Sequence, residues 1–450
     1  MDATALAALK KTLEERGVKY LLPTYSDLHG RSKSKMVPVG HLAKMMAGSE
    51  LFTGAAVEGV PQDVNDEEVS SHPDPASCTV LPWRPEIAWF ASDLWCEGKP
   101  FEPCSRNILG RVVAQANRMG YGVHAGVEAE FCVLKDAPRG GYVPLNARPH
   151  LEKPAYDVVR LLENMPWMSE LIDGMNQLGW GVYSLDHEDA IGQFEIDFNY
   201  FDVKTMADRM VFFRMMADEI ARRHGGFASF MPKPFADRAG SGAHFNLSLY
   251  DPQNKRNLFQ AEDDPRKCKL SKIGYQFIAG VLRHLPAICA VVAPTVNSYK
   301  RLVPRGSRAG FTWAPVFVCY GGNNRTNTVR IPLGGGRIEL RLADASCNPY
   351  LGFAMVVAAG LEGIRDKLDP GEPHWENMYL KTKAEREKLG VALLPRSLGE
   401  ALDAFEADPL SRAVMGEKMF QAWLEFKREE WHAYSVYVTD WEKDRYLKFF

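Results

Sequence analysis

Two glutamates, Glu128 and Glu130, stand two positions apart between the apolar residues Val127 and Phe131. This alternation predicts a β-strand, and side chains two apart on a strand point to the same face. Two carboxylates side by side repel each other, so such a pair requires water, a cation or protonation of one member. An exposed strand with two solvated acids fits the same pattern. Whether the two glutamates belong to a binding site depends on the other polar segments of the chain.

Three further segments combine one apolar face with one polar face, namely residues 191–198, 243–249 and 337–342. Their polar faces carry acids, amides, hydroxyls, a histidine and arginines: Gln193, Glu195, Asp197, His244, Asn246, Ser248, Arg337, Glu339 and Arg341. One such strand is typical of an ordinary sheet with one solvated side. Four of them predict a sheet that curves around a polar cavity.

The polar faces and a neighbouring loop offer hard metal ligands. The candidates are five glutamates and one histidine: Glu128, Glu130, Glu188, Glu195, Glu339 and His244. Carboxylate oxygens suit Mg²⁺ or Mn²⁺ better than a soft metal. Because five carboxylates exceed what one magnesium ion normally takes from a protein, we expect two or more ions.

Arginines form the second group of candidates: Arg301, Arg325, Arg330, Arg337 and Arg341. A planar guanidinium binds phosphate or carboxylate oxygens through two parallel hydrogen bonds. Metal ions together with arginines neutralise charge during phosphoryl transfer. The chain has no G-x-x-x-x-G-K-[ST] segment, so a P-loop is not the nucleotide site. A two-metal hydrolase would explain the acids but not the arginines.

Two units are expected to position these residues, with a boundary near residue 104 after Pro100 and Pro103. Residues 1–104 form a small, mostly β unit, in which the glycine-rich and acidic stretch 50–75 is predicted to be loop. Residues 105–450 form a larger unit in which strands alternate with long helices. One of these helices begins near Ser271 and is expected to bend or end near Pro286.

The composition excludes several classes of protein. Hydrophobic residues at 46% and charged residues at 25% are ordinary for a soluble globular protein, and a net charge of −3 gives no electrostatic case for nucleic acid or an anionic membrane. No segment approaches the roughly 20 apolar residues of a membrane span. The eight cysteines contain no C-x-x-C pair, which favours reduced thiols in a cytoplasmic protein.

Six groups of residues occur in a recognisable order. They are 126–131 (G-V-E-A-E-F), 187–188 with 192–195, 230–234 with 240–244, 297–304 (N-S-Y-K-R-L-V-P), 324–325 with 330–332, and 337–341 with 348–350. In this order they resemble the motifs of the glutamine synthetase family. The resemblance runs from about Tyr20 to the C-terminal region.

This resemblance implies an α+β fold, with an N-terminal β-grasp domain over residues 1–104 and a catalytic domain over residues 105–450. The catalytic domain would contain a curved antiparallel sheet and surrounding helices. The resemblance also implies a homo-oligomer, commonly a dodecamer of two hexameric rings, with active sites between subunits. Members of the family use ATP and Mg²⁺ or Mn²⁺ to phosphorylate the side-chain carboxylate of glutamate, and a nitrogen nucleophile then captures the acyl phosphate.

The motifs also imply roles for individual residues. One metal would be held by Glu130, Glu188 and Glu195. The second metal, on the ATP-phosphate side, would be held by Glu128, His244 and Glu339. The substrate glutamate would contact Gly240, Arg301, Arg341 and Glu130. The phosphates and the transferring phosphoryl group would face Arg325, Arg330 and Arg337. The rest of the nucleotide would lie near Lys233, Asn246, Ser248 and Tyr200.

Two departures from the family pattern fall at the nitrogen end of the site. In ammonia-using members a short loop ending G-Y-E-A-P supplies a glutamate that helps to bind and deprotonate ammonium. Here the loop over residues 305–313 is longer and contains no carboxylate, and Trp313 is the nearest match to that glutamate. The family's F-D-G-S-S appears as residues 52–56, so Thr53 replaces an aspartate that reaches the neighbouring subunit's ammonium site.

Loss of both carboxylates should weaken the binding of free ammonium, which needs anionic partners. An aromatic surface at Trp313 or Phe311 suits a small alkylamine, whose ammonium form gains about 0.5–2 kcal/mol from a cation–π contact. The sequence therefore predicts an ATP-dependent ligase that joins the γ-carboxylate of glutamate to a small amine, with methylamine as the first candidate.

Three alternatives remain open at this stage. In a true glutamine synthetase, ammonia would be held by another acid such as Glu50, Glu58 or Asp63. A polyamine ligase would need more acids near residues 305–313. An inactive structural relative would not be expected to keep the complete set of metal ligands.

Overall fold

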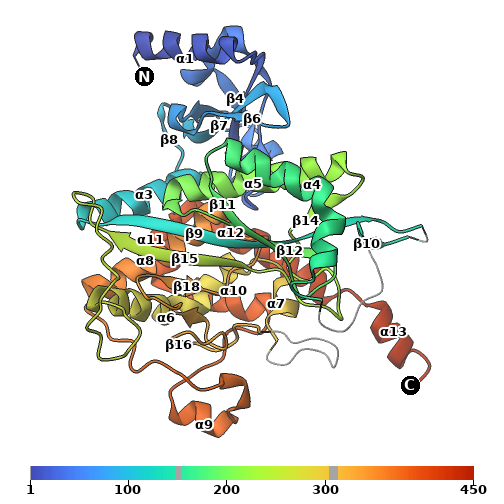
Figure 1. Ribbon diagram of the computed structural model, residues 1–450, viewed down its shortest axis with the longest axis vertical. Helices are drawn as coiled ribbons and strands as arrows, with labels where there is room; N and C mark the ends of the chain where they lie inside the picture. Colours follow the sequence, from blue (N-terminus) through green and yellow to red (C-terminus); the bar gives the residue numbers. More distant parts are fainter. Residues whose placement is uncertain (1, 139, 147–153, 304–312) are drawn as a thin grey trace.

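The computed structural model describes residues 2–138, 140–146, 154–303 and 313–450. An N-terminal mixed sheet curls at one end of the molecule, and a larger sheet with most of the helices forms the main body (Figure 1). The predicted α+β fold class is confirmed.

The N-terminal sheet is built around a parallel pair of strands, β1 (Tyr20–Ser26) and β7 (Arg84–Cys96). Around this pair the path runs β2-β1-β7-β5-β4, and three short strands pair beside it. The remaining bounds are β2 Ser32–Lys33, β3 Val37–Pro38, β4 Glu50–Phe52, β5 Val69–Pro73, β6 Thr79–Leu81 and β8 Lys99–Pro100. Helix α1 (Ala3–Glu15) begins at Asp2, whose carboxylate accepts the Ala5 amide and caps the first turn.

The central sheet has the order β11-β12-β9-β15-β18-β17-β16, and all these neighbours are antiparallel except β16 and β17. The bounds are β9 Gly122–Asp136, β11 Val182–His187, β12 Gln193–Phe198, β15 Ala243–Tyr250, β16 Tyr320–Gly321, β17 Val329–Arg330 and β18 Ile338–Leu340. Strand β9 also pairs with three short strands, β10 Tyr142–Pro144, β13 Phe201–Asp202 and β14 Phe227–Ser229. It is therefore the organising strand of the sheet.

The apolar residues of β9 lie in the core. Val127, Ala129 and Phe131 are at most 4% exposed, and they join one large cluster with the helices. Burial of a large apolar side chain contributes roughly 1.5–3 kcal/mol, so this face fixes the strand against the helices. The helices of the body are α3 Ser105–Arg118, α4 Val158–Gln177, α5 Val203–Arg223, α6 Lys272–Val292, α8 Pro349–Arg365, α10 Leu398–Ala407, α11 Pro409–Met415 and α12 Glu417–Ser435.

Short helices complete the described chain: α2 Leu42–Met46, α7 Ser298–Arg301, α9 Lys383–Lys388 and α13 Asp440–Tyr446. Helix α13 stands away from the main body near the C-terminus (Figure 1).

A buried arginine joins the N-terminal sheet to the helices of the body. Arg106, 3% exposed on α3, binds Asp74 at 2.8 Å and Asp93 at 2.9 Å from the N-terminal sheet region, and Asp208 on α5 at 2.8 Å. The Tyr350 hydroxyl donates to the same Asp208 at 2.7 Å. Buried charges persist only with such partners.

The loop prediction for residues 50–75 is wrong, and of the two outcomes expected at Pro286 the end of the helix is wrong, while the bend stays a prediction. The stretch 50–75 is not all loop, because β4 and β5 pair with each other through Glu50 and Ser71. Such short, non-local pairing leaves little periodicity to read in the sequence. Helix α6 does not end at Pro286 but continues to Val292. Its burial against α8 and α10 offsets the loss of one backbone donor.

Helix α6 is also the one described helix with the length and apolar composition to cross a membrane. Of its most apolar window, 83% is buried inside the protein, as in a core helix.

Glycines bring α6 and α8 close together. A Cβ atom on Gly280 would lie 2.0 Å from the Ala359 carbonyl oxygen and 2.9 Å from Gly363 Cα. Both neighbours are backbone atoms of α8, so they cannot move aside without shifting the helix.

We therefore expect Gly280→Ala to lower the free energy of unfolding by about 1–3 kcal/mol, as overpacking does. Thermal or urea denaturation at fixed protein concentration would measure it. The matched control is Gly110→Ala on α3, where a Cβ meets nothing within 4 Å and helix propensity improves. Equal effects of the two substitutions would show that the close crossing does not limit stability.

Candidate active site

Strand register brings the candidate ligands close together in neighbouring rungs of the central sheet. Glu130 of β9 lies opposite Glu195 of β12. Glu128 of β9 lies opposite His244 of β15, and Asn246 of β15 lies opposite Glu339 of β18. Directly opposed side chains have Cβ atoms about 4.5–5.5 Å apart, so the sheet concentrates these polar groups on one face.

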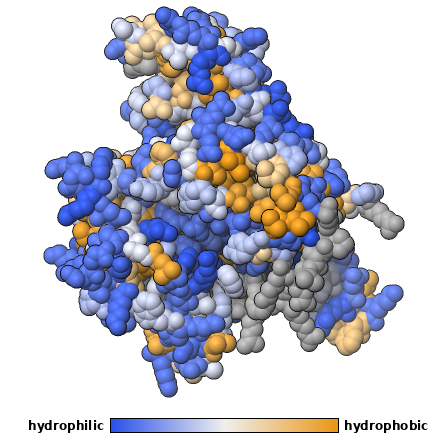
Figure 2. Space-filling model, viewed as in Figure 1, coloured by the Kyte–Doolittle hydropathy of each residue, from blue (hydrophilic) through white to orange (hydrophobic). Residues whose placement is uncertain are grey.

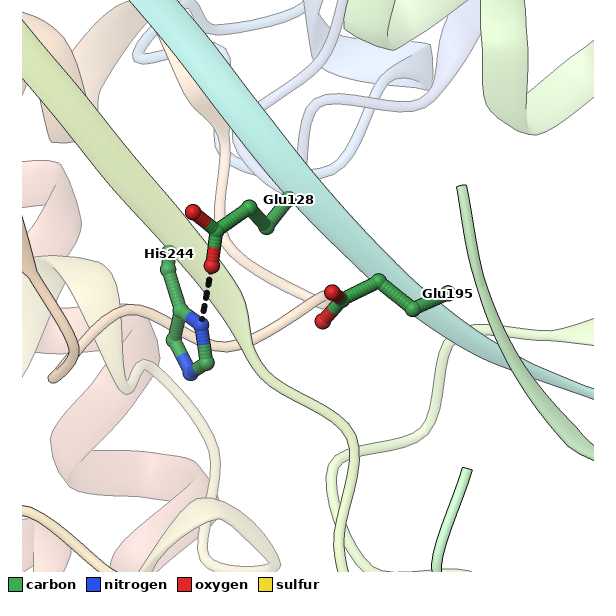
Figure 3. A group of neighbouring side chains, drawn as sticks. All are labelled: Glu128, Glu195 and His244. Carbon is green, nitrogen blue, oxygen red and sulfur yellow. Dashed lines mark hydrogen bonds and ion pairs between the residues drawn. The ribbon is translucent and has the colours of Figure 1, made fainter. Parts of the chain in front are cut away.

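Three of these side chains converge as a possible metal centre (Figure 3). Among the described residues, ligand atoms of Glu128, Glu195 and His244 all lie within 4.8 Å of one another. The shortest contact joins His244 Nδ1 to Glu128 Oε2 at 3.0 Å. One imidazole and two carboxylates form a hard donor set that suits Mg²⁺ or Mn²⁺.

Two further acids lie beside the same histidine. His244 Nε2 is 3.6 Å from Glu130 Oε1, and His244 Nδ1 is 3.7 Å from Glu339 Oε1. Glu195 thus lies close to Glu128 and His244 and also opposite Glu130, with which it lines the first cavity beside Glu188. The assignment of each acid to one of two metals stays a prediction.

The electrostatics of the acids fit a divalent cation. Burial, and then repulsion from Glu130, raises the pKa of Glu188 to about 8. Burial and the charges of Glu130 and Glu128 raise the pKa of Glu195 well above its usual range. For Glu128 burial acts upward on the pKa, but the hydrogen bonds from His244 and Asn246 and the charges of His244 and Arg330 together outweigh burial and lower the pKa to about 2. A bound cation would relieve this repulsion, so the residues present suit the metal that the sequence predicts.

A first cavity opens beside this cluster. Nine of the predicted site residues line it: Glu130, Glu188, Glu195, Gly240, His244, Arg301, Trp313, Arg325 and Arg341. It therefore brings carboxylates and guanidinium groups together around one space.

Backbone contacts hold the cavity walls in place. Arg301, on α7, donates to the carbonyls of Leu342 and Arg341, each at 3.0 Å. Glu130 accepts the Gly242 amide at 2.8 Å and the Gln193 side chain at 3.1 Å. A Cβ atom at Gly242 would lie 2.7 Å from an Arg301 nitrogen, so glycine is needed for this close approach.

Trp313 lies at the edge of the first cavity with half of its surface exposed. Its carbonyl accepts a hydrogen bond from Arg341 at 3.4 Å. The Arg325 guanidinium lies 5.5 Å from the centre of its ring, within the range of a cation–π contact. Phe311, the other predicted aromatic residue of this loop, lies outside the described residues.

A second cavity is lined by Glu128 and by other polar residues of β9 and β15. Hydrophilic side chains line a hollow in this face of the molecule (Figure 2). The predicted nucleotide residues Tyr200, Asn246, Ser248 and Arg337 all line it. Arg337 donates to Asn246 at 3.0 Å, and Asn246 donates to Glu128 at 2.9 Å. The two cavities thus meet at the contact between Glu128 and His244.

Four predicted site residues line neither cavity: Lys233, Arg330, Glu339 and Thr53. The Lys233 ammonium group donates to the Arg238 carbonyl. Arg330 binds the buried Glu339. Thr53, in the N-terminal sheet region, is exposed and donates to Glu68 at 3.2 Å. Its predicted role toward a neighbouring subunit stays a prediction.

The structure adds residues that sequence reasoning missed. His124 stacks on Tyr250 with ring centroids 3.9 Å apart, and both line the second cavity. Extending the strand alternation from Glu128 and Ser248 by two positions at a time would have found them. Tyr156 and Asp189 line the first cavity from loops, where no periodicity points to them.

Comparison with known proteins identifies the family. A model of the glutamine synthetase catalytic domain matches residues 102–446, so the chain belongs to the glutamine synthetase family. Its relatives include the glutamate–methylamine ligase of Methyloversatilis universalis, 41% identical over 97% of this chain and 98% of that protein. They also include the glutamine synthetase of Rhizobium leguminosarum bv. phaseoli, 39% identical over 96% of this chain and 97% of that protein.

Solved structures agree with this assignment. A GmaS/ADP complex has a TM-score of 0.90 and 38% identity, covering 98% of this chain and 99% of its own. GmaS without ligand gives a TM-score of 0.89 at the same identity. The predicted family is therefore confirmed.

The raised pKa of Glu188 makes stability depend on pH and metal. Its folded pKa of about 8 exceeds the usual 4.5, so the folded protein holds this proton more tightly. The stability that the proton contributes is present below pH 4.5 and lost as pH rises through about 8. We expect Mg²⁺ to raise the Tm of EDTA-treated protein more at pH 8 than at pH 6.

Glu188→Gln should reduce both the loss of Tm between pH 6 and pH 8 and the Mg²⁺-induced rise at pH 8. The exposed Glu429→Gln on α12 serves as the control. A Mg²⁺ effect that is equal at both pH values, and unchanged in Glu188→Gln, would contradict this account of the acids.

Proposed function

We propose that the protein is an ATP-dependent ligase that joins the γ-carboxylate of glutamate to a small amine, methylamine, through γ-glutamyl phosphate. One observation carries the proposal. A cavity lined by acids and by Arg301, Arg325 and Arg341 adjoins a second polar cavity through the contact between Glu128 and His244. Phosphoryl transfer between a nucleotide and a carboxylate requires two adjoining binding spaces and cationic groups that neutralise the charge of the transferring group.

Glutamate fits the first cavity by charge. The guanidinium groups of Arg301 and Arg341 bind its carboxylates, and Glu130 lies where it attracts the α-ammonium group. Arg301 is 7% exposed and its guanidinium is held by two carbonyls, so little ordering remains to be done when substrate binds.

The nucleotide fits the second cavity. Asn246, Ser248 and Tyr200 line the space for its base and sugar, and Arg337 faces its phosphates. A solved relative is a complex with ADP, which supports a nucleotide as the ligand. The divalent cation would be held by Glu128, Glu195 and His244 and would supply Lewis-acid neutralisation of phosphate charge. Arg325, exposed at the first cavity, would stabilise the transferring group.

Methylamine is the finer part of the proposal. Trp313 offers an aromatic surface at the first cavity in place of a carboxylate, and one relative is a glutamate–methylamine ligase. Glutamine synthetases at 39% identity keep ammonia as the alternative nucleophile. We further propose a ring-shaped homo-oligomer in the cytoplasm, in which Thr53 of one subunit approaches the amine end of its neighbour's site.

Phosphate release from ATP and Mg²⁺ should require both glutamate and an amine. We expect kcat/KM for methylamine to exceed that for ammonium, because the site offers an aromatic ring and lacks the ammonium-binding carboxylates. A concentration series of methylamine, ethylamine, putrescine and ammonium would measure this order. Preference for ammonium would identify a glutamine synthetase activity, and absence of turnover with every amine would favour an inactive structural relative.

The role of Trp313 can be separated from that of its neighbours. Trp313→Glu should shift the kcat/KM ratio of ammonium to methylamine upward by about 10-fold, since it exchanges a cation–π surface for an anion. Trp313→Phe should keep the wild-type order of amines. If the ratio is the same in all three proteins, Trp313 plays no part in choosing the amine.

A further inference from the structure

A second aromatic side chain stands at the acidic end of the first cavity. Tyr156 lies in the loop before α4 and lines the cavity together with Glu188, Arg325 and Trp313. Its side chain is 70% exposed. A tyrosine with this much exposed apolar surface beside a cluster of acids has no packing role that would explain it.

The backbone at Tyr156 is strained and firmly held. Its φ of +63° lies in the left-handed region, which costs a residue with a side chain about 1–2 kcal/mol. The Tyr156 amide donates to the His187 carbonyl at 2.8 Å, next to Glu188 in the chain. The following residue, Asp157, caps α4 by accepting the Val159 amide at 2.9 Å. Strain that the surroundings hold in this way is concentrated at ligand sites.

The charges of nearby acids act on the pKa of the Tyr156 phenol. Partial burial raises the pKa of Tyr156, and the charges of Glu188 and Asp186 raise it further. The group is therefore a neutral phenol at the pH of the reaction. A neutral phenol oxygen can accept an N–H hydrogen bond while its ring offers an apolar surface.

We infer that Tyr156 is a specificity-determining residue of the amine pocket, where its hydroxyl accepts a hydrogen bond from the alkylammonium ion and its ring, with that of Trp313, packs against the alkyl group. This inference rests on the proposed ligase function and adds a second wall to the pocket. Acids alone would attract any cation of suitable charge. The two aromatic rings would distinguish a small alkyl group from a larger one.

Two substitutions separate the two parts of the side chain. Tyr156→Phe removes the hydrogen-bond acceptor and keeps the ring, so KM for methylamine should rise about 3- to 10-fold. Tyr156→Ala removes the ring as well, so the kcat/KM ratio of ethylamine to methylamine should rise at least about 10-fold, the scale set by one methylene in an apolar pocket. KM for glutamate and KM for ATP should stay within about 2-fold of wild type in Tyr156→Phe.

The control is Tyr437→Ala, which removes an exposed tyrosine (65%) that lines neither cavity. Thermal denaturation in the presence of Mg²⁺ shows whether Tyr156→Ala folds, and Tyr156→Phe keeps the inference testable if it does not. A wild-type ratio of ethylamine to methylamine in Tyr156→Ala overturns the role of the ring. An unchanged KM for methylamine in Tyr156→Phe overturns the role of the hydroxyl.

These outcomes are distinct from failure of the proposed function. If the wild-type protein releases no phosphate with any amine, the ligase proposal is wrong and this inference falls with it. If wild type turns over methylamine and the Tyr156 variants raise KM only for glutamate, the ligase proposal stands and the assignment of Tyr156 to the amine is wrong.

Discussion

The register of β9 against β12 and β15 is the constraint on which the candidate site depends. It sets Glu130 opposite Glu195 and Glu128 opposite His244. A slip of β9 by one residue would turn Glu128 and Glu130 into the core and expose Val127 and Phe131. The buried apolar face therefore holds together a set of charges that repel one another on the opposite face. The energy that stabilises the fold and the electrostatic strain that favours cation binding come from the same strand.

Much of this arrangement could be predicted from the sequence, because both of its causes are local. The alternation of apolar and polar residues is sufficient to predict the strands that carry Glu128, Glu195, His244 and Glu339. The residue types then predict the ligands, because carboxylates bind hard metal ions and guanidinium groups bind phosphate. The order of the motifs also predicts the family. The similarity to known proteins over nearly the whole chain supports that prediction.

The rest could not be predicted, because it depends on distances between segments far apart in the chain. The sequence could not show that Glu195 of β12 comes within reach of both Glu128 and His244. It could not show that the Lys233 ammonium group is satisfied by a carbonyl five residues away. Tyr156 lies in a loop with a left-handed backbone, where neither periodicity nor glycine marks the position. Helix α6 continues past Pro286 because tertiary packing outweighs a local preference.

The buried Arg106 joint has a consequence for protein engineering. Its three aspartates come from two separate regions of the chain, so the N-terminal sheet and helix α5 are matched to each other through one guanidinium group. A hybrid that takes its N-terminal sheet from a relative must receive counterparts of Asp74 and Asp93 with it. Without them the guanidinium, 3% exposed, would lose two of its three anions, and loss of partners around a buried charge costs about 3–5 kcal/mol. Exchange of the N-terminal sheet among members of this family is therefore limited by the ion pairs of Arg106.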